Sequence, residues 1–79
     1  MHFILKQRKK INKIDEKLIK LLEKRFKLVG DIKVWKKRNK IQMEDKKREE
    51  FIVNKFERRR LPKKFVNNFF NLLFKEAKK

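Results

Sequence analysis

The chain has 79 residues, which make at most one small domain, and so short a chain buries too little surface to be comfortably stable alone. Its 27 lysines and arginines against 10 aspartates and glutamates give a net charge of +17. This charge attracts anions such as a nucleic acid, an acidic membrane or a small polyanionic metabolite. Hydrophobic residues still make up 39% of the sequence, too much for a disordered polycation, so the chain is expected to fold.

Several side chains that enzymes commonly use are missing. Cysteine is absent and His2 is the only histidine, so neither a disulfide nor a metal site is expected. Serine, threonine and tyrosine are absent too, which excludes a hydroxyl nucleophile. The opening residues are not apolar enough for a signal sequence, and no apolar segment is long enough to span a membrane. A cytoplasmic protein without membrane partners is therefore expected.

A long helix is predicted over 3–38, because this region contains neither proline nor a turn cluster and its apolar residues recur three or four positions apart once Arg25 is counted with them. At ~1.5 Å per residue, the helix would be roughly 50 Å long. A lone domain of this size cannot cover it, so the stripe is expected to pack against a partner chain. The stripe consists of Ile11, Ile14, Leu18, Leu21, Leu28, Ile32 and Trp35.

A second helix is predicted over 45–59, after a polar loop that begins near Asn39. Asp45 suits the N-cap of this helix, and Glu49 lies near the positive end of its dipole. Ile52 and Phe56 are its expected buried residues.

A third helix is predicted over 62–78, because Pro62 is tolerated in a first helical turn and apolar residues follow at helical spacing. The predicted fold class is all-α: one long and two shorter helices in an intertwined homodimeric helical bundle. Residues 1–79 would form a single helical domain. The apolar positions of the third helix are Phe65, Val66, Phe69, Phe70, Leu73 and Ala77.

Arg8 and Arg25 occupy places in the long helix where the stripe predicts Leu or Ile, and an unpaired cation there is costly. An ion pair with a neighbouring glutamate, or a side chain that reaches water, would explain either one. At ~100° per residue, however, Arg25 and Lys36 fall within ~20° of one face, roughly 16 Å apart, and can converge on one ligand. Arg8 points about 100° away and lies ~25 Å off, so it could reach that region only from a second chain.

Asp45, Arg48 and Glu49 form an Asp-x-x-Arg-Glu sequence at the start of the second predicted helix. Without any functional role, this sequence would simply be a capped helix start with solvated charges, and the pattern often occurs by chance. Combined with Lys36 and the arginines, it offers three or four cations and one carboxylate. Such a set would suit a dianion that also carries a hydroxyl group.

Nearly the whole chain resembles the all-helical class of chorismate mutase. Lys36 stands at the position of the family's lysine, and 45–49 at its Asp-x-x-Arg-Glu. The related isochorismate-pyruvate lyases usually lack the full Asp-x-x-Arg-Glu, so its presence favours the mutase. The matching runs of the first helix are Arg8-Lys9-Lys10-Ile11, Ile14-Asp15-Glu16-Lys17-Leu18 and Leu21-Leu22-Glu23-Lys24-Arg25.

The resemblance implies an isomerase of the shikimate pathway and aromatic amino acid biosynthesis, active as a homodimer. It would rearrange chorismate, a small dianion, to prephenate without a covalent intermediate, metal or cofactor. Arg25 and Arg8 of the partner subunit would bind the substrate carboxylates. Lys36 would contact a carboxylate and the ether oxygen, where negative charge develops.

The same resemblance assigns roles to the start of the second helix. The Asp45 backbone and the Glu49 side chain would hold the ring hydroxyl, and Arg48 would shape and charge the pocket. The implied catalytic residues are thus Arg25, Lys36 and Glu49. One departure concerns the third helix, where the family has a late Gln or Glu that donates to the ether oxygen. That position falls two residues beyond Lys79, which implies a weakened mutase, or a truncated or redesigned chain.

Two other readings of the sequence stay open. The charge of +17 and the run Arg58-Arg59-Arg60 favour a basic helical module that binds nucleic acid. Because the basic residues surround every predicted helix, any nucleic-acid binding is expected to be non-specific. An inactive dimerisation bundle of the same fold is the other alternative.

Overall fold

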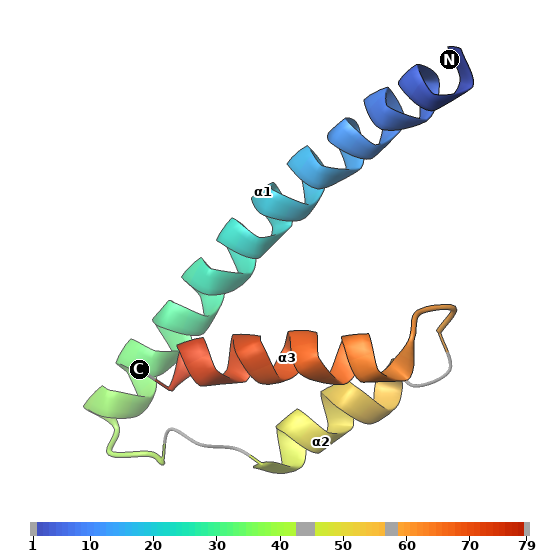
Figure 1. Cartoon of the computed structure of the whole chain (residues 1–79). Helices are drawn as coiled ribbons and strands as arrows, with labels where there is room; N and C mark the ends of the chain where they lie inside the picture. The colour runs from blue at the N-terminus through green and yellow to red at the C-terminus, as the bar shows by residue number, and fades with distance from the viewer. Residues whose placement is uncertain (1, 43–45, 57–58, 79) are drawn as a thin grey trace. The chain divides into compact units, whose positions relative to one another are not determined.

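A computed structural model of the chain contains three α-helices and no strand within the residues that it describes, which are 2–42, 46–56 and 59–78 (Figure 1). The predicted all-α class is therefore confirmed. The chain divides into two compact units, Met1–Gly30 and Asp31–Lys79. Within the described ranges, no helix has the length and apolarity needed to cross a membrane. The helices are α1 (His2–Arg38), α2 (Lys46–Lys55) and α3 (Lys63–Ala77).

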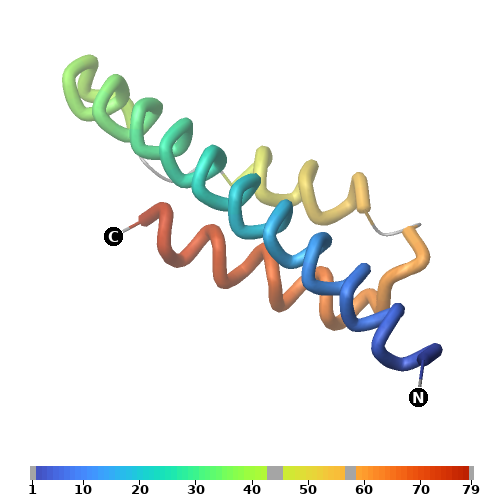
Figure 2. The backbone as a smooth tube through the Cα atoms, turned by 90° about the horizontal axis from the view of Figure 1, so that it is seen from above, coloured from blue at the N-terminus to red at the C-terminus, as the bar shows by residue number. Residues whose placement is uncertain are grey.

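Helix α1 is continuous over its 37 residues, so it is roughly 55 Å long (Figure 2). None of its residues is buried. The predicted apolar stripe, from Ile11 to Trp35, is between 49% and 62% exposed at each of its seven positions. Most helical stability in proteins comes from packing of an apolar face, and each residue of this stripe is exposed.

A Schellman motif ends α1 immediately after the predicted site lysine. The Ile41 N–H donates to the Lys36 carbonyl at 2.8 Å, and the Lys40 N–H donates to the Lys37 carbonyl at 3.4 Å. Lys40 takes the left-handed conformation that the motif requires, with φ of 55°. Asn39, the predicted stop, directly follows the last helical residue. These bonds fix the final turn of α1, from which the Lys36 side chain projects.

Helix α2 is shorter than predicted, because it ends at Lys55 and not near Arg59. Beyond it, the Phe56 N–H donates to the Val53 carbonyl at 3.2 Å and the Arg59 N–H donates to the Phe56 carbonyl at 3.3 Å. The chain must reverse before Pro62, and a proline disfavours helical backbone in the residue before it. Asp45, the predicted N-cap, lies outside the described residues.

Helices α2 and α3 pack antiparallel as a hairpin (Figure 1). At the turn end of the hairpin, the rings of Phe56 and Phe70 stack with centroids 5.4 Å apart and planes 7° from parallel. At its open end, Glu49 pairs with Lys78. From the first pair to the second, the chain steps back seven residues along α2 and forward eight residues beyond Phe70. Nearly equal steps in opposite directions are what two antiparallel helices require.

The core of the hairpin differs in part from the predicted one. Val66, Leu73 and Phe74 are its buried residues, and Phe74 was not among the predicted apolar positions. Phe65, which was predicted there, is 59% exposed because it lies to one side of the face that meets α2. Ile52 and Phe56 are half-buried rather than buried. The apolar spacing therefore located helix α3 correctly but not the centre of its buried face.

The left-handed Lys40 gives a stability prediction. Lys40→Gly is expected to raise the free energy of unfolding by about 0.5–1 kcal/mol, because glycine adopts positive φ without the steric cost of a Cβ. Urea unfolding followed by circular dichroism measures the change. Lys40→Ala removes the same charge but keeps the Cβ, so it should bring no such gain, and equal gains in the two variants would contradict the explanation.

Candidate active site

Arg25 and Lys36 belong to the least exposed face of α1. Six residues of the helix are half-buried, and all but Gly30 recur at intervals of three or four, which places those five along one side. The two cations therefore lie on the same side of the continuous helix. The six half-buried residues are Leu22, Arg25, Val29, Gly30, Lys33 and Lys36.

The remaining predicted site residues have different surroundings. Arg8 is exposed and lies in the first unit with Arg25. Arg48 is exposed in the first turn of α2, and Asp45 lies outside the described residues. Glu49, by contrast, is half-buried. Of the residues predicted at the start of the second helix, Glu49 is the one whose described side chain enters the gap between α2 and α3.

The Glu49 carboxylate is bound by the ammonium group of Lys78. The Lys78 Nζ lies 3.3 Å from Oε2 and donates a hydrogen bond to Oε1, also at 3.3 Å. Lys78 caps the C-terminus of α3, where its backbone N–H donates to the carbonyls of Phe74 and Lys75 at 3.2 and 3.3 Å. The ion pair thus joins the first turn of α2 to the end of α3.

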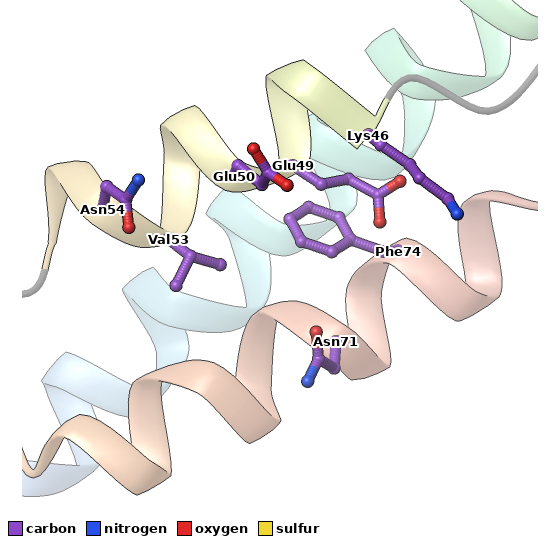
Figure 3. Close-up of a pocket in the computed structure, with 7 residues that line it drawn as sticks. All are labelled: Lys46, Glu49, Glu50, Val53, Asn54, Asn71 and Phe74. Carbon is purple, nitrogen blue, oxygen red and sulfur yellow. The ribbon is translucent and has the colours of Figure 1, made fainter.

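A shallow hollow of about 330 Å³ lies between α2 and α3 on one side of Glu49 (Figure 3). Val53 from α2 and Phe74 from α3 point into the gap, and the Glu49 carboxylate lies at its edge. The volume is at the lower end of the ~300–1,000 Å³ found for small-ligand pockets. The lining residues are Lys46, Glu49, Glu50, Val53, Asn54, Asn71 and Phe74.

A second hollow, of about 380 Å³, shares Glu49, Asn71 and Phe74 with the first. Two lysines and two asparagines of α3 contribute to its lining. Glu49 therefore stands between two concave surfaces whose polar groups are mostly ammonium and amide donors. The other residues that line this second hollow are Asn68, Leu72, Lys75 and Lys78.

Sequence reasoning missed Lys78 and Asn71 as neighbours of Glu49. A signal was present, because Phe70, Phe74 and Lys78 follow one another at intervals of four and so lie on one face of α3. The predicted apolar positions instead continued from Phe70 to Leu73 and Ala77. These residues lie along the neighbouring edge of the same helix face. Only the pairing of α3 with α2 shows which of the two edges meets Glu49.

These groups define the chemistry that the chain can perform. Arginine and lysine side chains bind carboxylates by charge-assisted hydrogen bonds, and a carboxylate such as Glu49 accepts a hydrogen bond from a hydroxyl group. The sequence has no thiol or hydroxyl side chain to act as a nucleophile. The residues therefore suit binding and electrostatic stabilisation of a hydroxylated anion better than covalent catalysis.

Comparison with known families identifies the chain. Residues 7–79 match the model of the family described as chorismate mutase type II, which covers all three helices apart from the first turn of α1. Searches of curated proteins and of solved structures found no match. The family resemblance predicted from the sequence is thus confirmed, and the chain belongs to the chorismate mutase type II family.

Proposed function

We propose that the chain is an active chorismate mutase, an isomerase that converts chorismate to prephenate. The family match over residues 7–79 is the observation that carries this proposal. Two features of the structure support it: Arg25 and Lys36 share a half-buried face of α1, and Glu49 borders a hollow of suitable size. The net charge of +17 would also favour the encounter with a dianionic substrate.

The reaction fits the side chains that this sequence contains. In the Claisen rearrangement, an ether C–O bond breaks while a C–C bond forms within one molecule, and no proton or electron is gained or lost. The enzyme therefore needs no nucleophile, acid, base or cofactor. It accelerates the reaction by holding the reactive conformer and by stabilising negative charge on the ether oxygen.

The proposed roles of the residues follow from their chemistry. The Arg25 guanidinium binds a substrate carboxylate, for which its planar fork of donors is suited. The Lys36 ammonium donates to a carboxylate and to the ether oxygen as the C–O bond breaks. Glu49 accepts a hydrogen bond from the ring hydroxyl, together with the backbone of Asp45. Arg48 adds positive charge at the pocket.

A homodimer completes this proposal. The apolar stripe of α1 is about half exposed along its length, and a second copy of α1 would cover it. In an antiparallel pairing of two such helices, Arg8 of the partner subunit reaches the region of Arg25 and binds the second carboxylate. Each of the two active sites then contains residues from both chains.

The role of Lys36 can be tested by removing its charge. Lys36→Met is expected to lower kcat by about 10²–10³-fold, as the loss of one preorganised donor to a developing oxyanion does. The loss of chorismate absorbance measures the rate. Lys37→Met is the matched control, because Lys37 is the next residue of α1 and is exposed. Equal rates in the two variants would contradict the proposed site.

The shared site can be tested by mixing two impaired variants. Arg8→Ala and Glu49→Gln should each be weakly active alone, because every site of either homodimer has one defect. Mixed subunits form heterodimers in which one site has both defects and the other has none. An equimolar mixture that exchanges freely should therefore recover about a quarter of the unmodified activity. Activity that stays at the mean of the two separate variants would show that each site lies within one chain.

A further inference from the structure

We propose that Lys78 is a positioning residue that holds the Glu49 carboxylate in place for the substrate. This inference rests on the proposed function, in which Glu49 accepts a hydrogen bond from the substrate hydroxyl. The observation behind it is the contact between the Lys78 ammonium and both oxygens of Glu49, each at 3.3 Å. No feature of the sequence alone pairs these residues, which are 29 positions apart.

The ion pair joins two fixed pieces of backbone. Lys78 is the C-cap of α3, and its N–H donates to the carbonyls of Phe74 and Lys75. Glu49 lies in the first turn of α2. The stacked rings of Phe56 and Phe70 set the register of the two helices at the other end of the hairpin. The distance that the Lys78 side chain must span is therefore determined by the packing of α2 on α3.

Partial exposure argues that the pair acts through geometry and contributes little to stability. The side chains of Lys78 and Glu49 are 39% and 24% exposed, so water screens their attraction and little desolvation strengthens it. A glutamate side chain without a fixed partner can rotate about three bonds and loses that freedom when it binds a ligand. Lys78 restricts the rotation before the substrate arrives, so that the carboxylate already faces the hollows that it borders.

The position of Lys78 at the end of α3 also favours a positively charged side chain, which the proposed contact with Glu49 requires. A cation at the C-terminus of a helix interacts favourably with the partial negative charge of the last carbonyl groups. Lys78 stands at that end of α3, and its ammonium group extends to α2. The chain therefore presents a lysine that both complements the α3 dipole and fixes the orientation of Glu49.

The proposal predicts the effect of Lys78→Met, which removes the charge but keeps a long apolar side chain. We expect kcat/KM for chorismate to fall about tenfold, since a displacement of ~1 Å in a substrate-binding group can cost as much as ~10²-fold. The midpoint of thermal unfolding should change by only a few degrees. Lys78→Arg restores a cation and should recover most of the loss. Lys64→Met is the control, because Lys64 is an exposed lysine at the far end of α3.

A double-mutant cycle shows whether Lys78 acts through Glu49 or affects activity independently of it. In the Glu49→Gln background, Lys78→Met should have little further effect, because the carboxylate that it positions is already gone. An equal tenfold loss in both backgrounds would overturn the proposal. Full activity of Lys78→Met beside impaired Glu49→Gln would leave the mutase function standing but reject the role of Lys78. Absence of turnover by the unmodified chain would reject the proposed function itself, and this inference with it.

Discussion

The antiparallel packing of α2 on α3 is the interaction on which the candidate site depends. Phe56 and Phe70 stack at one end of this hairpin, and Phe74 is buried near the middle. Once these rings fix the register, Glu49 and Lys78 meet at the other end. Burial of aromatic surface therefore contributes the free energy of this packing, and the partly exposed ion pair is proposed to orient a carboxylate. Without the aromatic contacts, the first turn of α2 would have no defined partner.

Helix α1 presents the opposite case, because the residues of its apolar stripe are about half exposed. Its half-buried face holds Arg25 and Lys36, while the exposed stripe runs from Ile11 to Trp35. Most of the stability of a helix in a protein comes from the packing of its apolar face. The proposed second copy would supply the missing packing and, through Arg8 of the partner subunit, a missing cation. Folding, assembly and catalysis would then depend on the same surface.

The sequence pattern predicted the helices well, because the spacing of apolar residues and the presence of a proline determine the backbone conformation of the residues next to them. The start of α1 and both bounds of α3 differ from the prediction by one residue, and the end of α1 matches it. The sequence missed the early end of α2 and the left-handed conformation of Lys40, since each depends on how the chain reverses. It also missed Phe74 and Lys78, because their neighbours belong to another helix. Contacts between two helices depend on how the helices are aligned along each other. The spacing of residues within one helix does not determine that alignment.

The proposed catalysis, by a chain without any thiol or hydroxyl side chain, is a rearrangement achieved by binding and charge alone. Proton nuclear magnetic resonance of chorismate incubated with the purified chain tests it most directly, because the spectrum resolves substrate from product. We expect prephenate to form faster than in the protein-free solution and to be the sole initial product. Conversion at the uncatalysed rate, or release of pyruvate, would contradict it.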